Sequence, residues 1–202
     1  LVGIFVIMLL KTGLPYVGLQ ANWQQIITGL ILILAVCAAD QLTKLWALNY
    51  IFTHATALAA NTPALASGLP HVGDSVPVID GVLHMTYIEN PGMSFGLLTE
   101  HRWIFMTVSA VAILAILVYL FTLKGKPKLL CTALALVVGG GIGNMFDRVL
   151  LGYVVDFIDV RLFGSLWTWV FNAADAAVCV GAGLLVLYCL LSYKKEKKET
   201  AR

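Results

Sequence analysis

Charged residues are scarce in this sequence of 202 residues. Only 12% are Asp, Glu, Lys or Arg, about half of the roughly 25% found in soluble domains. Hydrophobic residues make up 60%, and the mean hydropathy is +0.90. This composition excludes an ordinary soluble globular protein and predicts a single membrane domain. A net charge of only +2 gives no reason to expect a nucleic-acid partner.

Several familiar functional motifs are also missing. The sequence contains no HExxH and no Gly-rich phosphate loop, so these signatures of zinc peptidases and nucleotide-binding proteins give no lead. The four histidines and four cysteines have no metal-ligand spacing. We therefore expect no metal and no organic cofactor, and we expect the cysteines to pack as small apolar residues.

Long apolar stretches dominate what is present. A helix needs roughly 20 apolar residues to cross a bilayer. Such stretches run from about Ile26 to Trp46, Trp103 to Leu123, Leu129 to Phe146 and Trp167 to Tyr193. We predict an all-α polytopic membrane protein with four transmembrane helices and a small extracytoplasmic β-hairpin or sheet, which forms a cradle.

The segments outside these spans differ in character. We interpret residues 1–20 as an N-terminal extension, too short in its apolar part to cross and without the pattern of a cleaved signal peptide. Residues 53–75 are small, polar and proline-containing, and are predicted to be a flexible insert. Residues 76–98 hold two predicted strands around the Asp80-Gly81 turn, which form the cradle. Residues 194–202 form a basic tail.

The distribution of Lys and Arg predicts the orientation. The segment from Leu45 to His101 has neither residue, whereas "KGKPK" (124–128) and the tail "KKEKKETAR" are rich in lysine. The positive-inside rule places these basic segments, and both termini, in the cytoplasm. Arg148 and Arg161 would then lie on the outer side, and each needs a specific reason to be there.

Carboxylates near span ends are the main candidates for function, because an ionisable group in a membrane is costly. The acids in question are Asp40, Asp147, Asp156, Asp159 and Asp175. Asp40 and Lys44 are four residues apart on one helix, and we interpret them as a local ion pair rather than as catalytic groups.

The pattern Asn-x-x-Asp occurs twice near the outer ends of spans. Asn144 and Asp147 share one helical face, as do Asn172 and Asp175, so each amide can bind its carboxylate or a substrate. Asp147 also adjoins Arg148, which indicates an ionised structural carboxylate or one that positions the arginine. Arg148 itself could hold a lipid phosphate or substrate carbonyl, or anchor the helix at the interface. The glycines of "GGGIGN" (139–144) favour close approach of a helix or of substrate backbone.

Asp156 and Asp175 stand apart from the other acids. Both lie in apolar surroundings with no neighbouring cation in the sequence. If the third and fourth spans pack, the segment with Asp156 can fold back over Asp175, and two close carboxylates share one proton. This predicts an aspartic-protease pair. A proton path of a small transporter or channel is the main rival, and a purely structural membrane scaffold is a third interpretation.

Four stretches, in this order, resemble the lipoprotein signal peptidases (signal peptidase II). They are "DQLTK" (40–44), "NPGMSFG" (90–96), "GGGIGNMFDRVLLGYVVDF" (139–157) and "FNAAD" (171–175). The similarity extends over about residues 26–193. The insert at 53–75 and residues 1–20 depart from the usual family pattern.

The resemblance implies roles for the residues that match. Asp156 and Asp175 would be the catalytic dyad of an aspartic endopeptidase. The residues that would bind substrate or support the dyad are Asn90, Asn144, Arg148, Asn172, Asp40, Lys44 and Asp147. The resemblance further implies a substrate, a prolipoprotein that is cleaved just before a diacylglyceryl-modified cysteine. It also implies a monomeric enzyme in the bacterial inner membrane, with its active site at the outer face.

Overall fold

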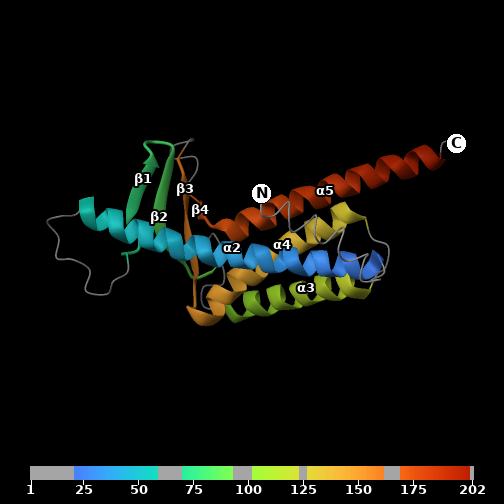
Figure 1. Cartoon of the computed structure of the whole chain (residues 1–202), viewed down its shortest axis with the longest axis horizontal. Coiled ribbons are helices and arrows are strands. Elements are labelled where there is room, and N and C mark those ends of the chain that lie inside the picture. Colours follow the sequence, from blue (N-terminus) through green and yellow to red (C-terminus); the bar gives the residue numbers. More distant parts are fainter. Residues whose placement is uncertain (1–20, 59–69, 93–101, 123–126, 162–168, 201–202) are drawn as a thin grey trace.

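In the part of the chain that the structure describes, four helices lie in broadly the same direction and a small sheet crosses one end of them (Figure 1). The structure is a computed structural model, and it describes residues 21–58, 70–92, 102–122, 127–161 and 169–200. The helices are α2 (Ala21–Leu58), α3 (Arg102–Thr122), α4 (Lys128–Leu150) and α5 (Ala173–Thr200). The strands are β1 (Ser75–Ile79), β2 (Leu83–Asn90), β3 (Val154–Val160) and β4 (Val170–Phe171).

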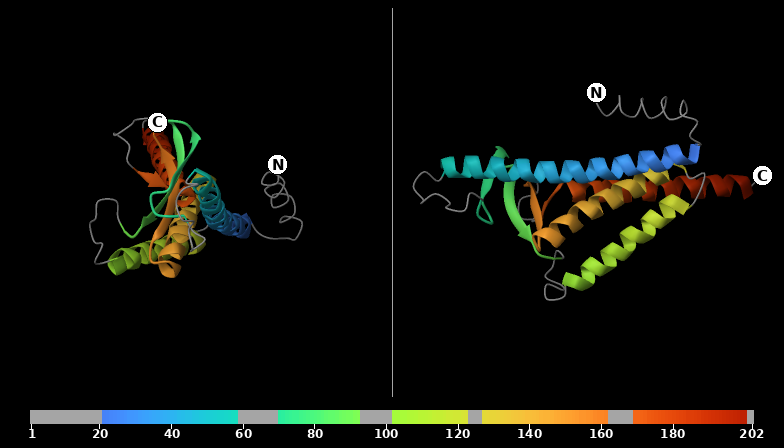
Figure 2. Two further views of the ribbon diagram at one scale, coloured as in Figure 1. Left: turned by 90° about the vertical axis from the view of Figure 1, so that its left-hand side faces the viewer. Right: turned by 60° about the horizontal axis from the view of Figure 1, so that its bottom comes forward.

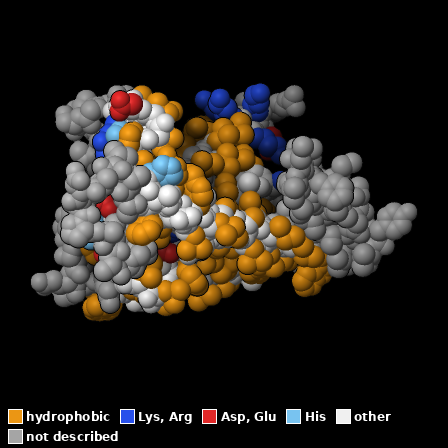
Figure 3. All heavy atoms as spheres, turned by 60° about the vertical axis from the view of Figure 1, so that its left-hand side comes forward, with side chains coloured by type: hydrophobic (Ala, Val, Ile, Leu, Met, Phe, Trp, Pro, Cys, Tyr) orange, Lys and Arg blue, Asp and Glu red, His pale blue; other side chains and the backbone are white. Residues whose placement is uncertain are grey.

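Three of these helices are long and apolar enough to cross a membrane, namely α2 over Trp23–Ala55, α4 and α5. In α3 the apolar part is shorter, Met106–Thr122. Hydrophobic side chains cover the helices as a broad band, with lysines gathered beyond one end of it (Figure 3). The mostly helical membrane architecture is thus confirmed, whereas the count of four spans stays a prediction.

Helix α4 occupies the centre of the helical layer and contacts α2, α3 and α5 (Figure 2). Its glycines allow this close packing. A Cβ on Gly140 would overlap the carbonyl oxygen of Ala174 at the start of α5, and one on Gly143 would lie 2.7 Å from Asp40 Oδ2 of α2. The packing interpretation of the "GGGIGN" stretch is therefore confirmed: α4 brings the beginning of α5 and the middle of α2 together.

The sheet is antiparallel throughout, in the order β1-β2-β3-β4. β1 and β2 form the hairpin predicted around Asp80 and Gly81, and Pro77 lies in the edge strand β1, where a proline is tolerated. β3 and β4 come from the segments before and after residues 162–168 and were not predicted. They extend the hairpin and connect it to α4 and α5.

The sheet is held by the far end of α2. Thirty-eight residues make α2 about 57 Å long, well beyond the roughly 30 Å of a bilayer core. Ala47 and Ile51 of this end are fully buried against the sheet residues Val76, Met85, Tyr87, Val155 and Phe157. This apolar core fixes the sheet at one end of the helices.

Some predicted segment boundaries change. α2 continues to Leu58, so the first residues of the predicted flexible insert (53–75) are helical. The predicted basic tail (194–202) is helical as far as Thr200. The whole predicted extension (1–20) lies outside the described residues, as do part of the insert (59–69) and the end of the cradle (93–98).

Candidate active site

The two carboxylates predicted as a pair come from different elements. Asp156 lies in β3, which follows α4 after a tight turn at Gly152, whose φ of +88° favours glycine. Asp175 lies in the first turn of α5. The turn folds β3 back across the start of α5, so the fold-back predicted from the sequence is present.

Asn172 connects the two carboxylates. Its side-chain Nδ2 donates to Asp156 Oδ1 at 2.7 Å, and its backbone N–H donates to Asp175 Oδ2 at 3.2 Å. In return, the backbone N–H of Asp175 donates to Asn172 Oδ1 at 2.9 Å. This reciprocal pair is a capping box at the start of α5. A helix cap therefore also serves as the bridge between the candidate catalytic groups.

Two further asparagines complete the set. Asn90 Nδ2 donates to Asp156 Oδ2 at 3.0 Å, and Asn144 Nδ2 donates to Asp175 Oδ1 at 2.7 Å. Asn144 Oδ1 in turn accepts from Asn172 Nδ2 at 3.0 Å. Asn144 thus binds Asp175 across the interface between α4 and α5. The spacing of residues along α4 alone could not predict this contact. Each aspartate accepts hydrogen bonds on both of its oxygens.

Burial makes Asp156 unusual among these groups. Its exposed fraction is 2%, and burial, together with the charge of Asp175, raises its pKa to about 6. The hydrogen bonds from Asn90 and Asn172 oppose this change, because they favour the ionised form. The two carboxylates are therefore coupled electrostatically.

A buried ion cluster lies behind the pair. Lys44 Nζ lies 2.7 Å from Asp40 Oδ2 and 2.8 Å from Asp147 Oδ2, and all three side chains are buried. The Asp40–Lys44 pair is confirmed. Asp147 forms its ion pair with Lys44, because packing of α4 on α2 brings the lysine within reach. This contact fits the first alternative given for Asp147, an ionised structural carboxylate.

This cluster holds the backbone beside each candidate catalytic residue. Asp40 Oδ1 accepts from the N–H of Ala174 at 3.0 Å, directly before Asp175. Asp147 Oδ2 accepts from the N–H of Val155 at 3.1 Å, directly before Asp156. The two carboxylates on Lys44 thus hold the two chain segments whose separation determines how far apart the aspartates lie.

Gln41 belongs to this cluster and was not predicted. Its Nε2 donates to Asp147 Oδ1 at 2.9 Å, to Asp40 Oδ2 at 3.2 Å and to the carbonyl of Gly143 at 3.4 Å. The only sequence signal was its place inside "DQLTK", beside two residues that were chosen. An uncharged amide within a helix gives no reason of its own to predict a functional residue.

Arg148 is half-buried and faces the carboxylates. Its Nη1 donates to the carbonyl of Asn144 at 3.3 Å, and its charge interacts favourably with Asp175, Asp156 and Asp147. This position favours a role in the site over that of an interfacial anchor, and it explains one of the two arginines on the predicted outer side.

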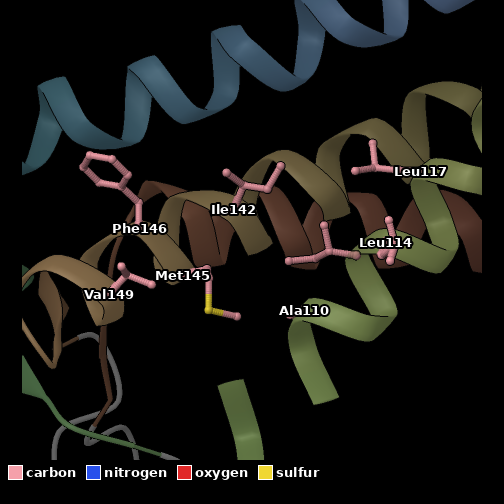
Figure 4. A pocket seen from close by; sticks show the side chains of 8 residues that line it. Ala110, Leu114, Leu117, Ile142, Met145, Phe146 and Val149 are labelled. Atoms are coloured by element: carbon pink, nitrogen blue, oxygen red, sulfur yellow. The ribbon is translucent and has the colours of Figure 1, made fainter. Parts of the chain in front are cut away.

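An apolar groove of about 420 Å³ lies between α3 and α4, away from this site (Figure 4). Ile142, Met145 and Val149 line it from one face of α4, whereas Asn144 and Asp147 bind partners from α5, α2 and β3. With only apolar side chains around it, the groove suits lipid chains and holds no group for proton transfer.

Known proteins resemble this chain in sequence and in structure. Residues 31–191 match the family described as signal peptidase (SPase) II. The chain is similar to the lipoprotein signal peptidase of Clostridioides difficile, at 35% identity over 83% of this chain and 98% of the relative. It is also similar to that of Desulfitobacterium hafniense, at 42% identity over 63% and 82%.

A solved structure described as a bacterial membrane enzyme superposes with a TM-score of 0.65 at 26% identity, covering 83% of this chain and 90% of that one. A second with the same description gives 0.62 at 28% identity, over 81% and 92%. Residues 31–191, which the family model matches, include each candidate site residue. The chain therefore belongs to the signal peptidase II family.

Proposed function

We propose that this protein is an aspartic endopeptidase that removes the signal peptide from diacylglyceryl-modified prolipoproteins, with Asp156 and Asp175 as its catalytic dyad. One observation carries the proposal: Asn172 bridges two carboxylates of which one, Asp156, is buried with a pKa near 6. A coupled pair that shares one proton is the arrangement that aspartic peptidases use.

The surroundings divide the roles between the two residues. Burial favours the protonated form of Asp156, which then donates a hydrogen bond to the scissile carbonyl. Asp175 lies in the first turn of α5, where the helix macrodipole stabilises negative charge. It also accepts from Asn144 and from the backbone of Asn172. Asp175 is therefore the base that activates water.

The reaction proceeds in two balanced steps. Asp175 takes a proton from water as the water oxygen attacks the carbonyl carbon, and Asp156 gives its proton to the carbonyl oxygen, which forms a gem-diol. Asp175 then protonates the amine as the C–N bond breaks, and a hydroxyl of the gem-diol returns its proton to Asp156. The dyad ends in its starting state, and no cofactor takes part.

The family and the position of the site both support this substrate. The site lies where the apolar helices meet the sheet, so the acyl chains of a lipidated cysteine can stay in the bilayer while its peptide bond reaches the dyad. Arg148, beside the carboxylates, is placed to hold a peptide carbonyl or the polar part of the lipid. We expect a monomer in the bacterial inner membrane, with the site at the outer face.

Purified protein and a synthetic precursor peptide test this proposal. The peptide carrying a diacylglyceryl cysteine is expected to be cut once, so that the lipidated cysteine becomes the new N-terminus. The same peptide without lipid should remain intact, and a globomycin-type inhibitor should stop cleavage. Equal cleavage of the unlipidated peptide, or none of either, would contradict the proposal. A transporter or a scaffold would cleave neither peptide.

A further inference from the structure

The pairing of β2 with β3 changes register by one residue within the sheet. Before the change, Leu83 lies opposite Val160 and Met85 opposite Ile158; after it, Ile88 lies opposite Asp156 and Asn90 opposite Val154. Thr86 and Tyr87 of β2 therefore lie opposite the single residue Phe157. This arrangement is a β-bulge, a feature found often beside active sites, where it re-aims a side chain.

The bulge determines which residue faces Asp156. Asn90 lies opposite Val154, two positions from Asp156 on β3, so its side chain is on the same face as that of Asp156. Accordingly, Asn90 Nδ2 donates to Asp156 Oδ2. If the first register continued, Asn90 would lie opposite Tyr153, three positions away, and would face the opposite side of the sheet.

Side chains hold the bulge in place. Thr86 Oγ1 donates to Asp159 Oδ2 at 2.8 Å, and both residues are buried. Arg161 donates to the same oxygen through Nε at 2.8 Å and Nη2 at 2.6 Å. Ser75 Oγ lies 2.9 Å from Thr86 Oγ1 and accepts from Arg161 Nη2 at 3.0 Å. Burial alone would raise the pKa of Asp159, but the hydrogen bonds from Arg161 and Thr86 lower it, so the carboxylate stays ionised.

The backbone groups of Tyr87 at the bulge find their hydrogen-bond partners in the loop before β1. The N–H of Tyr87 donates to the carbonyl of Asp74 at 2.9 Å, and the N–H of Gly73 donates to the carbonyl of Tyr87 at 2.8 Å. The loop before β1 thus supplies the partners that the extra residue cannot find on β3. Arg161, an unexpected charge on the predicted outer side, is explained by this cluster.

We propose that Thr86 and Asp159 form a latch that fixes the register of β2 on β3 and so positions Asn90 against Asp156. Both are positioning residues that act through Asn90. The proposal deepens the proposed function, because it explains how the dyad is kept in its geometry by residues that do not touch substrate.

The test compares Thr86→Val, which removes the hydroxyl at nearly constant shape, with Thr86→Ser, which keeps it. Thr107→Val, at an exposed position of α3 whose hydroxyl bonds only its own helix, is the matched control. Thr86→Val is expected to lower kcat about tenfold, and Thr86→Ser and Thr107→Val to leave it nearly unchanged. In an Asn90→Ala background, Thr86→Val should cause no further loss, because residues acting through one contact are not additive.

An infrared titration of the Asp156 carboxyl, assigned by difference from Asp156→Asn, provides a readout that needs no peptidase activity. Loss of the Asn90 hydrogen bond removes an interaction that favours the ionised form, so Thr86→Val and Asn90→Ala should each shift the midpoint to higher pH. An unchanged midpoint in Thr86→Val would overturn the latch, as would equal losses of kcat in both backgrounds. Failure of the peptidase proposal alone would leave this titration shift intact.

Discussion

At the scale of single residues, the site depends on which carboxylate carries a proton. Asp156 is almost fully buried, and its pKa is raised to about 6 by burial and by Asp175. Asp175 is partly exposed at a helix start. Two identical side chains thus receive different roles from their surroundings.

This assignment predicts the pH dependence of cleavage. Because Asp156 must be protonated to act as the acid, and its pKa is raised to about 6, kcat/KM should fall as the pH rises through that value. A profile of kcat/KM for the lipidated peptide measures this apparent value for the coupled pair. A profile that instead rises through pH 6 would reverse the assignment.

Lys44 gives a second prediction at this scale. Lys44→Met leaves Asp40 and Asp147 buried without their shared cation, which is expected to cost about 3–5 kcal/mol of folding stability. Thermal melting in detergent should show a large decrease. Lys195→Met is the control, since Lys195 and Glu199 form an exposed pair at 3.9 Å; it should change melting little. Equal melting of both variants would show that the cluster adds nothing to stability.

At the scale of elements, sequence reasoning was most reliable where partners are local. Asp40 and Lys44 are one helical turn apart, and the Asp80-Gly81 turn indicates a hairpin directly. Asp156 and Asp175 were conspicuous because their apolar neighbours leave them no local partner. Those signals were enough to predict Asp156 and Asp175 as the candidate pair.

Contacts between distant segments could not be predicted in the same way. The spacing of Asn144 and Asp147 shows that they share a face but not that they bind α5 and Lys44. β3 was missed because "VVDFIDV" is as apolar as the end of a span, and its pairing depends on β2, more than sixty residues earlier. The bulge at Thr86 leaves no mark on the sequence, since it arises from a mismatch between two strands.

Gly140 provides a prediction about how α4 meets α5. A Cβ there would overlap the carbonyl of Ala174 and lie 2.8 Å from Val178 Cγ2, so Gly140→Ala should push the start of α5, with Asp175, away from Asp156. We expect at least a tenfold loss of kcat and a lower melting temperature.

Gly183→Ala is the control for this change, because a Cβ at Gly183 meets nothing within 4 Å. In an exposed part of α5 the substitution should stabilise the helix by up to about 1 kcal/mol and leave kcat unchanged. Full activity of Gly140→Ala would show that the α4–α5 contact does not set the position of Asp175.

At the scale of the whole molecule, exposed tryptophans mark where the helices leave the membrane. Trp46, Trp103 and Trp169 are each more than half exposed. Trp46 and Trp103 lie toward the sheet end of α2 and α3, and Trp169 directly precedes β4. Trp23 is exposed near the other end of α2. Trp23 and Trp46 are about 34 Å apart along the helix axis, which matches the thickness of a bilayer core. Tryptophan favours both interfaces, so we expect the sheet to lie just outside the membrane and the dyad at its boundary.

Cysteine labelling checks this orientation. A membrane-impermeant thiol reagent applied to right-side-out vesicles should label Val78→Cys, on an exposed position of β1, without detergent. Lys198→Cys, near the end of α5, should be labelled only after detergent is added. The unsubstituted protein gives the background from its four cysteines. The opposite pattern would invert the predicted orientation.

The most direct measurement compares cleavage of the lipidated peptide by Asp156→Asn and Asp175→Asn with that by the unsubstituted protein, alongside thermal melting. Asparagine preserves the size of each side chain but cannot exchange the proton. The account predicts that each substitution lowers kcat/KM by about 10³-fold or more while the protein still melts cooperatively. Cleavage at a near-normal rate by either well-folded variant would contradict it.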